Sequence, residues 1–180
     1  AYAFAILFLV HQLFAKRFKR TYFALHVFAN AVITALSVKA GIRALMNPTT
    51  STVPVDHVDA GHYYMIWVYA IHVYHPIFFK TNQMDWIHHI PVYILNTLMF
   101  SVIAGDVFML QSVILTGVPG GVDYFLLVLV GEGVMERATY KDISSFINQW
   151  IRGPLGFIAG YVCLIGLYHN FDFVILRNHI

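Results

Sequence analysis

Long apolar runs separated by short polar stretches are the main pattern along this chain. Runs of this kind with few charges predict helices that cross a membrane, for which about 20 apolar residues suffice. We therefore expect an all-α fold, a polytopic membrane bundle of about six transmembrane helices in a single domain. The predicted spans are residues 1–14, 21–45, 61–79, 86–104 with a bent extension to 117, 122–136 and 155–170. Residues 142–152 alternate apolar and polar side chains and predict a helix lying at the membrane interface.

Glycine and proline mark the expected boundaries between these segments. Residues 47–60 contain two prolines and a group of turn-forming residues, which predicts an external loop. The sequence GVPGG at residues 117–121 predicts a sharp turn, and Gly153-Pro154 is expected to end the interfacial helix. Residues 1–14 are too short to cross by themselves, so we expect this span to begin before the first residue given.

The composition supports an integral membrane protein. Of the 180 residues, 59% are hydrophobic and only 11% are charged, against roughly 25% charged in average globular proteins. A net charge of +2 with scattered basic residues gives no reason to expect a nucleic-acid partner. The single cysteine, Cys163, excludes a disulfide framework within the chain and a thiolate metal site. The organelle stays open among the endoplasmic reticulum, the mitochondrial inner membrane and the thylakoid.

Basic residues cluster just after the first apolar run. The four are Lys16, Arg17, Lys19 and Arg20. They predict either a binding site for anionic lipid or an anchor that sets orientation, and the anchor is the favoured interpretation. If this cluster is on the inner side, alternation puts the 47–60 loop outside and Lys80, Arg137, Lys141 and Arg152 inside. That alternation requires residues 86–117 to cross once, which favours six spans over seven.

Polar residues inside the apolar runs are the candidates for function. In the second span His26, Asn30 and Thr34 are four apart and form one stripe, which normally faces other helices. In the third span His72 and His75 share a face just before Pro76. Ionisable groups next to hydrocarbon are costly, so these histidines need a structural or chemical reason.

The fourth span opens with the most suggestive element, DWIHH at residues 85–89. Asp85 is a suitable N-cap acceptor, and His88 and His89 follow within about one turn. Tyr93 and Asn96 continue the stripes of the two histidines and are candidate lipid contacts. We expect the histidine pair to point into the helix cluster near the positively charged side.

Three kinds of chemistry could use these histidines. A di-metal oxidase needs more histidine boxes than the two pairs found, so we assign no metal site. A haem or chlorophyll needs only one neutral imidazole, for which His26, His72 and His75 are candidate axial ligands. In acid–base chemistry His88 or His89 would take a proton from a substrate hydroxyl or amine, oriented by the carboxylate of residue 85, 106 or 123.

The DWIHH element, at the mouth of a middle helix that follows an aromatic-rich span, resembles the TLC-domain family. The resemblance covers roughly residues 15–170, and the Asp-x-x-His-His element is its specific part. It implies a bundle of membrane helices that handles lipids. In the ceramide synthases of that family, paired histidines serve the joining of a long-chain base to an acyl chain, so the resemblance implies His88 and His89 as the reactive pair, with Asp85 beside them.

The chain departs from the ceramide synthases in their second motif. That motif has closely spaced His-Asp, Asp and Glu-x-x-Lys, whereas this chain has Asp123 and Glu132 at a different spacing. The resemblance therefore favours lipid binding over catalysis. If the protein is an enzyme, the resemblance implies acyl transfer to a lipid amine or hydroxyl.

The first functional hypothesis is a TLC-like membrane protein that binds or handles lipid in a cavity near Asp85, His88 and His89. The first alternative is a non-catalytic accessory subunit of a large respiratory, ATP-synthase or photosynthetic membrane complex. The small size and abundant aromatic residues fit burial against partner subunits. A carrier of haem or chlorophyll is the second alternative. Membrane lipids are the expected ligands in the first case, and other subunits the expected partners in the second.

Overall fold

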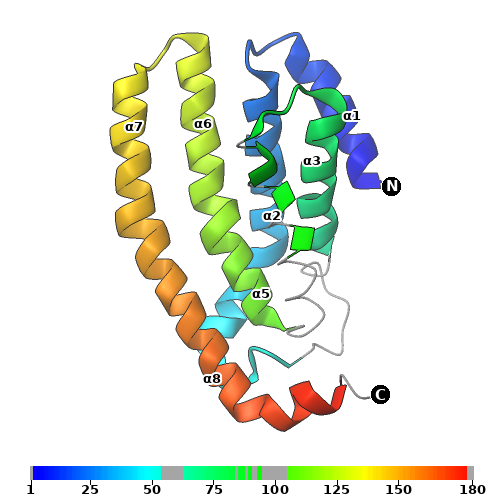
Figure 1. The fold of residues 1–180 in the computed structure, drawn as a ribbon, viewed down its shortest axis with the longest axis vertical. Helices are drawn as coiled ribbons and strands as arrows, with labels where there is room; N and C mark the ends of the chain where they lie inside the picture. Colours follow the sequence, from blue (N-terminus) through cyan, green and yellow to red (C-terminus); the bar gives the residue numbers. More distant parts are fainter. Residues whose placement is uncertain are drawn as a thin grey trace.

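The computed structural model describes residues 2–53, 63–83, 85–87, 89–90, 93–94 and 105–177, without the side chains of 172–177. The elements along these residues are helical, with no strand among them, which confirms the predicted all-α bundle (Figure 1). In chain order they are α1 (Tyr2–Ala15), α2 (Thr21–Met46), the short 3-10 helix η1 (Pro48–Thr50), α3 (Tyr64–Phe78), α5 (Asp106–Gln111), the π-helix η3 (Ser112–Gly117), α6 (Val118–Glu132), α7 (Arg137–Phe146), the π-helix η4 (Ile147–Arg152) and α8 (Gly153–Arg177).

Helix α2 lies at the centre of the bundle. It packs against α1, α3, α5 and α6, while α7 runs beside α6 and α8 continues past α5 and η1 at the lower end of the bundle (Figure 1). The main core joins α1, α2, α3 and α5 around fully buried side chains such as Leu25, Ile33 and Tyr74. A second, smaller cluster joins the end of α2 to α5 and α8.

Glycine allows α2 to approach the 106–132 helix closely. A Cβ atom on Gly41 would lie 3.2 Å from the backbone of Leu110, and one on Gly117 would overlap the hydroxyl of Thr34. Helix pairs in membranes gain their stability from such close van der Waals packing, because lipid provides little hydrophobic driving force between helices. The predicted stripe of His26, Asn30 and Thr34 therefore does face other helices.

Three described helical runs are long and apolar enough to span a membrane. They are Thr21–Met46, Asp106–Glu132 and Arg137–Phe171. The apolar helix α1 is shorter, as its sequence predicted, and α3 has 15 residues. The structure thus agrees with an integral membrane protein, whereas the full number of six spans stays a prediction because most of the predicted 86–104 span lies outside the described residues.

The predicted turn at residues 117–121 was wrong, because one continuous helical run covers Asp106–Glu132. The predicted boundary between a span ending at 117 and one beginning at 122 is therefore wrong too. Pro119 lies two residues after the end of η3, whose wider turn leaves room for the proline ring. The glycines there serve close packing against α2 rather than a change of direction.

The predicted break at Gly153-Pro154 was also wrong, because a continuous helical run covers these residues. Pro154 lies two residues after the end of η4, and the helix continues from Arg137 to Phe171 in one run of 35 residues. Residues 142–152 are consequently not a separate interfacial helix, and 155–170 is not a separate span. At its lower end α8 kinks at Asn170, whose side-chain amide donates hydrogen bonds to the backbone oxygens of Thr49 and Gly166.

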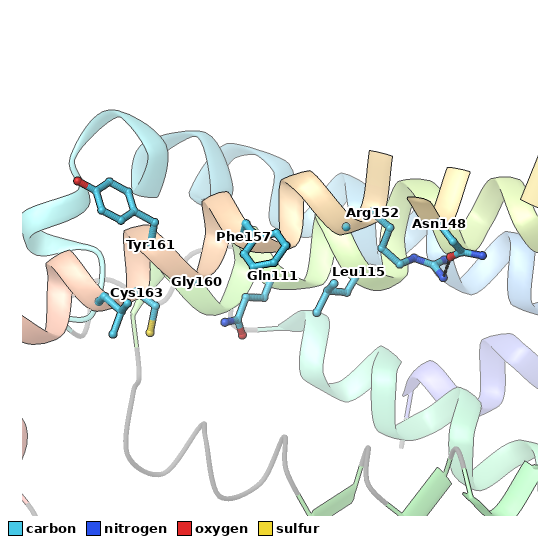
Figure 2. Close-up of a pocket in the computed structure, with 11 residues that line it drawn as sticks. Gln111, Leu115, Asn148, Arg152, Phe157, Gly160, Tyr161 and Cys163 are labelled. Atoms are coloured by element: carbon cyan, nitrogen blue, oxygen red, sulfur yellow. Dashed lines mark hydrogen bonds between the residues drawn. The ribbon is translucent and has the colours of Figure 1, made fainter. Parts of the chain in front are cut away.

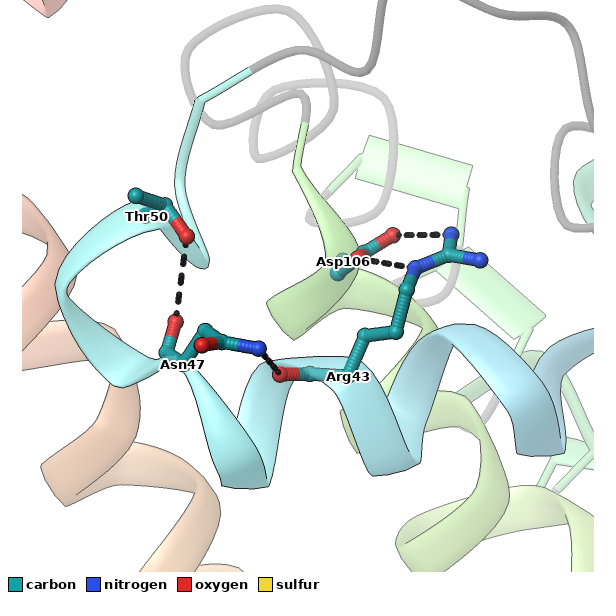
Figure 3. A network of polar contacts seen from close by, with 4 residues as sticks. All are labelled: Arg43, Asn47, Thr50 and Asp106. Carbon is teal, nitrogen blue, oxygen red and sulfur yellow. Dashed lines mark hydrogen bonds and ion pairs between the residues drawn. The ribbon is translucent and has the colours of Figure 1, made fainter.

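An ion pair ties the lower end of α2 to the start of α5. The guanidinium of Arg43 donates from Nε and Nη2 to the two carboxylate oxygens of Asp106, at 2.8 and 2.9 Å (Figure 3). Next to this ion pair, the backbone N–H of Val107 donates to the backbone oxygen of Ser51 at 3.0 Å. Asp106 is thus held at this end by Arg43, which removes it as a candidate for orienting a histidine of the 85–89 element.

The opposite end of the bundle carries the turn between α1 and α2 and the connection from α6 to α7 (Figure 1). The backbone N–H of Lys19 donates to Glu132 at 2.7 Å and joins these two connections. The basic cluster and Arg137 therefore lie at the same end of the bundle, as the charge alternation predicted. Arg152 does not, because it lies roughly 22 Å along the helix from Arg137 at about 1.5 Å per residue.

Candidate functional site

A polar cavity of about 180 Å³ lies inside the bundle, enclosed by α2, α3, η3 with α6, and η4. Its apolar walls come mainly from Ile33, Val68 and Leu115. Its polar walls come from His26, Asn30, His72, Thr116, Asp123, Tyr124 and Arg152. Seven polar or ionisable side chains around one small cavity in a bundle with membrane-spanning helices require compensation, because lipid offers no hydrogen bonds.

His26 presents an unused ring nitrogen within this site. Its side chain is 4% exposed, and Nδ1 lies 3.0 Å from the backbone oxygen of Tyr22. A carbonyl oxygen can only accept, so Nδ1 carries the proton and Nε2 of the neutral ring has a free lone pair. Across the described part of the chain, Nε2 has no hydrogen-bond partner.

Arg152 brings a positive charge to the same cavity. Its Nη1 donates to the side-chain oxygen of Asn148, one turn earlier on the same helix. Its Nε is buried and has no partner among the described residues, and none of their carboxylates forms an ion pair with it. Gly120 makes room for this arrangement, since a Cβ there would lie 3.2 Å from Asn30 and 3.9 Å from Arg152.

The carboxylate of Asp123 also lines the cavity but is already engaged by α7. The hydroxyl of Ser144 donates to one of its oxygens, and the hydroxyl of Tyr140 donates to the other at 3.4 Å. These bonds hold α7 against α6. Asp123 is therefore occupied in helix packing, which argues against its predicted role in orienting His88 or His89.

A cluster of histidines adjoins the cavity. His75 Nδ1 and His89 Nε2 share a hydrogen bond of 3.1 Å, and the rings of His72 and His89 are 5.1 Å apart. The ring centroids of His26 and His75 are 6.0 Å apart. These four histidines are buried, so the structure brings together residues that the sequence placed in three separate spans.

The start of the DWIHH element is placed differently from the prediction. The backbone N–H of Asn82 donates to the carboxylate of Asp85 at 2.7 Å, and the backbone N–H of Asp85 donates back to the side chain of Asn82 at 3.1 Å. This reciprocal pair makes Asn82 the capping residue and puts Asp85 three positions inside. The predicted N-cap role of Asp85 was therefore wrong.

Two predicted residues, His88 and Asn96, lie outside the described residues. Tyr93 is described and half-buried, with its ring 6.3 Å from that of His72 and nearly parallel to that of Tyr69. It therefore belongs to the histidine cluster rather than to the wall of the cavity.

The predicted lipid-binding cluster at residues 16–20 lies apart from the cavity, at the end of the bundle. Lys16, Arg17, Lys19 and Arg20 are exposed in the turn between α1 and α2. The stem of Arg20 packs onto Gly131 of α6, so part of its length serves packing. The choice between an orientation anchor and a lipid site stays a prediction.

An apolar groove of about 890 Å³ runs along α8 (Figure 2). Gly153, Gly156 and Gly160 leave its floor open, and Figure 2 shows Arg152 with Asn148 toward one end and Cys163 with Tyr161 toward the other. Arg152 and Leu115 line both the groove and the cavity. The apolar groove and the polar cavity are thus adjacent, with these two side chains between them.

The described residues do not fit a metal ion or a tetrapyrrole at this cavity. No group of three His, Cys, Asp or Glu side chains in the described ranges is arranged to hold a metal. A volume of 180 Å³ is also below the roughly 300–1,000 Å³ of sites that bury drug- or cofactor-sized ligands. His26, His72 and His75 consequently gain no support here as axial ligands.

Arg152 is the important residue that the sequence analysis misplaced. A single arginine at the end of an amphipathic segment resembles a residue at the membrane boundary. The signal that could have found it is its i, i+4 spacing from Asn148, which puts both on one face of a helix. Comparisons of the chain with protein-family models, with curated proteins and with solved structures found no match.

Proposed function

We propose that this protein binds a lipid inside the membrane, with the polar head in the cavity and the hydrocarbon chain in the groove along α8. The observation that carries the proposal is that Arg152 and Leu115 line both spaces. An amphiphile fits this pair of spaces better than a wholly apolar or a wholly polar molecule. The DWIHH element supports the same conclusion through its resemblance to the lipid-handling TLC-domain family.

Energetics favour occupation of the cavity by a polar group. An unsatisfied polar atom in an apolar medium costs several kcal/mol, on the order of 2–7 depending on the reference state. Two residues that line the cavity each have such an atom, Nε2 of His26 and Nε of Arg152. A lipid head that hydrogen-bonds to them recovers this cost, while a chain in the groove replaces membrane lipid at little expense.

Binding without a chemical step accounts for the described contacts. His89 is hydrogen-bonded to His75, and the carboxylates at 106 and 123 serve helix packing. Acyl transfer to a lipid amine or hydroxyl is the reaction to test if bound lipid is found to turn over. Membership of a larger membrane complex is the competing proposal, and the same experiment addresses it.

The experiment is native mass spectrometry of the full chain, purified in mild detergent from a membrane of known lipid content. Leu115→Trp narrows the junction between groove and cavity, and Ile42→Trp on the exposed face of α2 is the matched control. We expect lipid adducts on the wild type and on Ile42→Trp, and their loss from Leu115→Trp. Equal lipid content in the wild type and both variants would contradict the proposed site. A stable assembly with many other chains would favour the competing proposal, that the protein is a subunit of a larger membrane complex.

A further inference from the structure

The chemical class of the lipid head follows from the unsatisfied atoms of two residues that line the cavity, His26 and Arg152. The neutral ring of His26 donates through Nδ1 to Tyr22, so Nε2 can only accept a hydrogen bond. The guanidinium of Arg152 has no acceptor atoms, so its Nε–H can only donate. A matching head therefore supplies one donor and one acceptor.

Charge adds a third requirement. Arginine stays protonated in proteins, so Arg152 brings a full positive charge into the bundle. The ion pair of Arg43 with Asp106 shows how this fold compensates such a charge elsewhere, whereas no described carboxylate pairs with Arg152. Arg152 is half-buried and its Nε is fully covered without a partner, so a ligand that becomes an anion compensates this charge better than one that stays neutral.

Common lipid heads differ in these properties. An ester accepts but does not donate. An alcohol does both but stays neutral, and an ammonium head would repel Arg152. A carboxylic acid donates from its hydroxyl, accepts at its carbonyl oxygen and can release a proton to become an anion, which meets all three requirements.

Resting on the lipid-binding function proposed above, we propose that the ligand is a long-chain carboxylic acid held between His26 and Arg152. The acid enters the groove in its neutral form, which avoids bringing a charge through apolar surroundings. In the cavity its O–H proton passes to Nε2 of His26. The products are a carboxylate paired with Arg152 and an imidazolium whose Nδ1–H still donates to Tyr22. The total charge is unchanged, and no other reactant is consumed.

The volumes of the cavity and the groove agree with a long-chain carboxylic acid. The cavity of about 180 Å³ has room for a small head, and the groove of about 890 Å³ is within the range of sites that bury whole ligands. A phosphate monoester offers the same donor and acceptor chemistry as a carboxylic acid. The test therefore includes one as a separate ligand.

The experiment measures binding of four ligands to the delipidated full chain in detergent: oleic acid, its methyl ester, oleyl alcohol and an oleoyl lysophosphatidic acid. We expect oleic acid to bind about tenfold or more tightly than the ester and the alcohol, because hydrogen bonds to charged groups are the stronger ones. It should also bind more tightly than the phosphate. The infrared spectrum of carboxyl-labelled oleic acid on the wild type should show a carboxylate band rather than a protonated carbonyl.

Three variants assign the effect to the proposed residues. Arg152→Gln removes the charge, and His26→Asn retains an N–H near the position of Nδ1 but removes Nε2. Each is expected to reduce affinity for oleic acid about tenfold and affinity for oleyl alcohol by a clearly smaller factor, because the alcohol loses a neutral hydrogen bond and the acid a charge-assisted one. The control Lys141→Gln removes an exposed cation from the same long helix and should change neither. If Arg152→Gln does not fold, Arg152→Lys keeps the cation and should keep the preference for acid over ester.

The outcomes separate this inference from the proposed function. Equal binding of acid, ester and alcohol, or tighter binding of the phosphate, would overturn the carboxylic-acid head and leave lipid binding intact. A protonated carbonyl band in the bound acid would overturn the proton transfer to His26. Absence of binding by all four ligands would overturn both proposals.

Discussion

At the scale of single residues, several charged and polar side chains of the bundle are paired across helix interfaces. Arg43 meets Asp106 between α2 and α5, and Ser144 meets Asp123 between α7 and α6. These contacts specify which helices lie side by side, because apolar surfaces alone discriminate poorly between partners in lipid. The two unsatisfied atoms on residues that line the cavity differ from this pattern, and that difference is the reason to assign them to a ligand.

Asp106→Ala is expected to lower the free energy of unfolding by about 2 kcal/mol. Removing one partner of a fully buried pair costs about 3–5 kcal/mol, and the 34% exposure of the Arg43 side chain reduces that figure. Replacing both partners by Arg43→Met with Asp106→Leu should recover part of the loss. The free energy of unfolding of each variant is measured in mixed micelles, with tryptophan fluorescence as the signal.

The matched control for the ion pair is Lys39→Met. Lys39 is an exposed cation on the same helix, four residues before Arg43, so its loss should leave stability nearly unchanged. A loss of stability as large in Lys39→Met as in Asp106→Ala would show that general surface charge, and not the ion pair, sets the effect.

At the scale of elements, two long helices carry an internal proline without ending there. Pro119 and Pro154 each follow a six-residue π-helix, η3 and η4. A proline within an α-helix loses one backbone hydrogen bond and clashes with the preceding turn, and a π-helical turn widens the backbone where that clash would occur. η3 contributes Leu115 and η4 contributes Arg152, so both π-helices also supply the junction of the proposed lipid site.

Gly105→Ala is expected to destabilise the fold by about 1–3 kcal/mol, the usual cost of overpacking. A Cβ there would overlap the backbone oxygen of Ser51, which is backbone rather than a flexible side chain and cannot rotate away. Thermal unfolding followed by circular dichroism in detergent measures the change.

Gly160→Ala is the comparison for that substitution. Gly160 lies within α8, where a Cβ meets nothing within 4 Å. Alanine has the higher helix propensity, so this variant should unfold at the same or a slightly higher temperature. If both variants lost stability equally, the close approach at Gly105 would not be the cause.

At the scale of the whole molecule, the two ends of the bundle differ in charge and in architecture. One end carries the basic turn at residues 16–20 together with Arg137 and Lys141. The other carries η1, the start of α5 and the kinked end of α8 (Figure 1). A surplus of Lys and Arg marks the inner side of membrane proteins, so the basic end is expected to face inward.

Single exposed cysteines test this orientation in a Cys163→Ala background. Arg17→Cys and Glu136→Cys lie at the basic end, and Thr49→Cys lies at the other. In sealed vesicles, a membrane-impermeant maleimide should label the first two from one side and Thr49→Cys from the opposite side. Labelling of all three from the same side would contradict the bundle's orientation across the membrane.

Much of the fold could be predicted from the sequence, because apolar length and scarcity of charge follow directly from the solvent that a membrane protein meets. The all-α class and the span at α2 are confirmed in this way. The boundaries at residues 117–121 and at Gly153-Pro154 could not be predicted. Glycine and proline signal a turn in isolation, whereas here glycine provides close helix contact and the π-helices accommodate proline.

The sequence by itself also determined that His26, His72, His75 and His89 lie in apolar segments, where an imidazole is energetically costly unless it is hydrogen-bonded. Only the tertiary structure decided which partners they have, because residues far apart in the chain meet only when the helices pack. Arg152 depends on tertiary structure most of all. Its local sequence is typical of a membrane boundary, and only the uninterrupted helix from α7 into α8, with space left by Gly120, places this half-buried residue at the same cavity as His26.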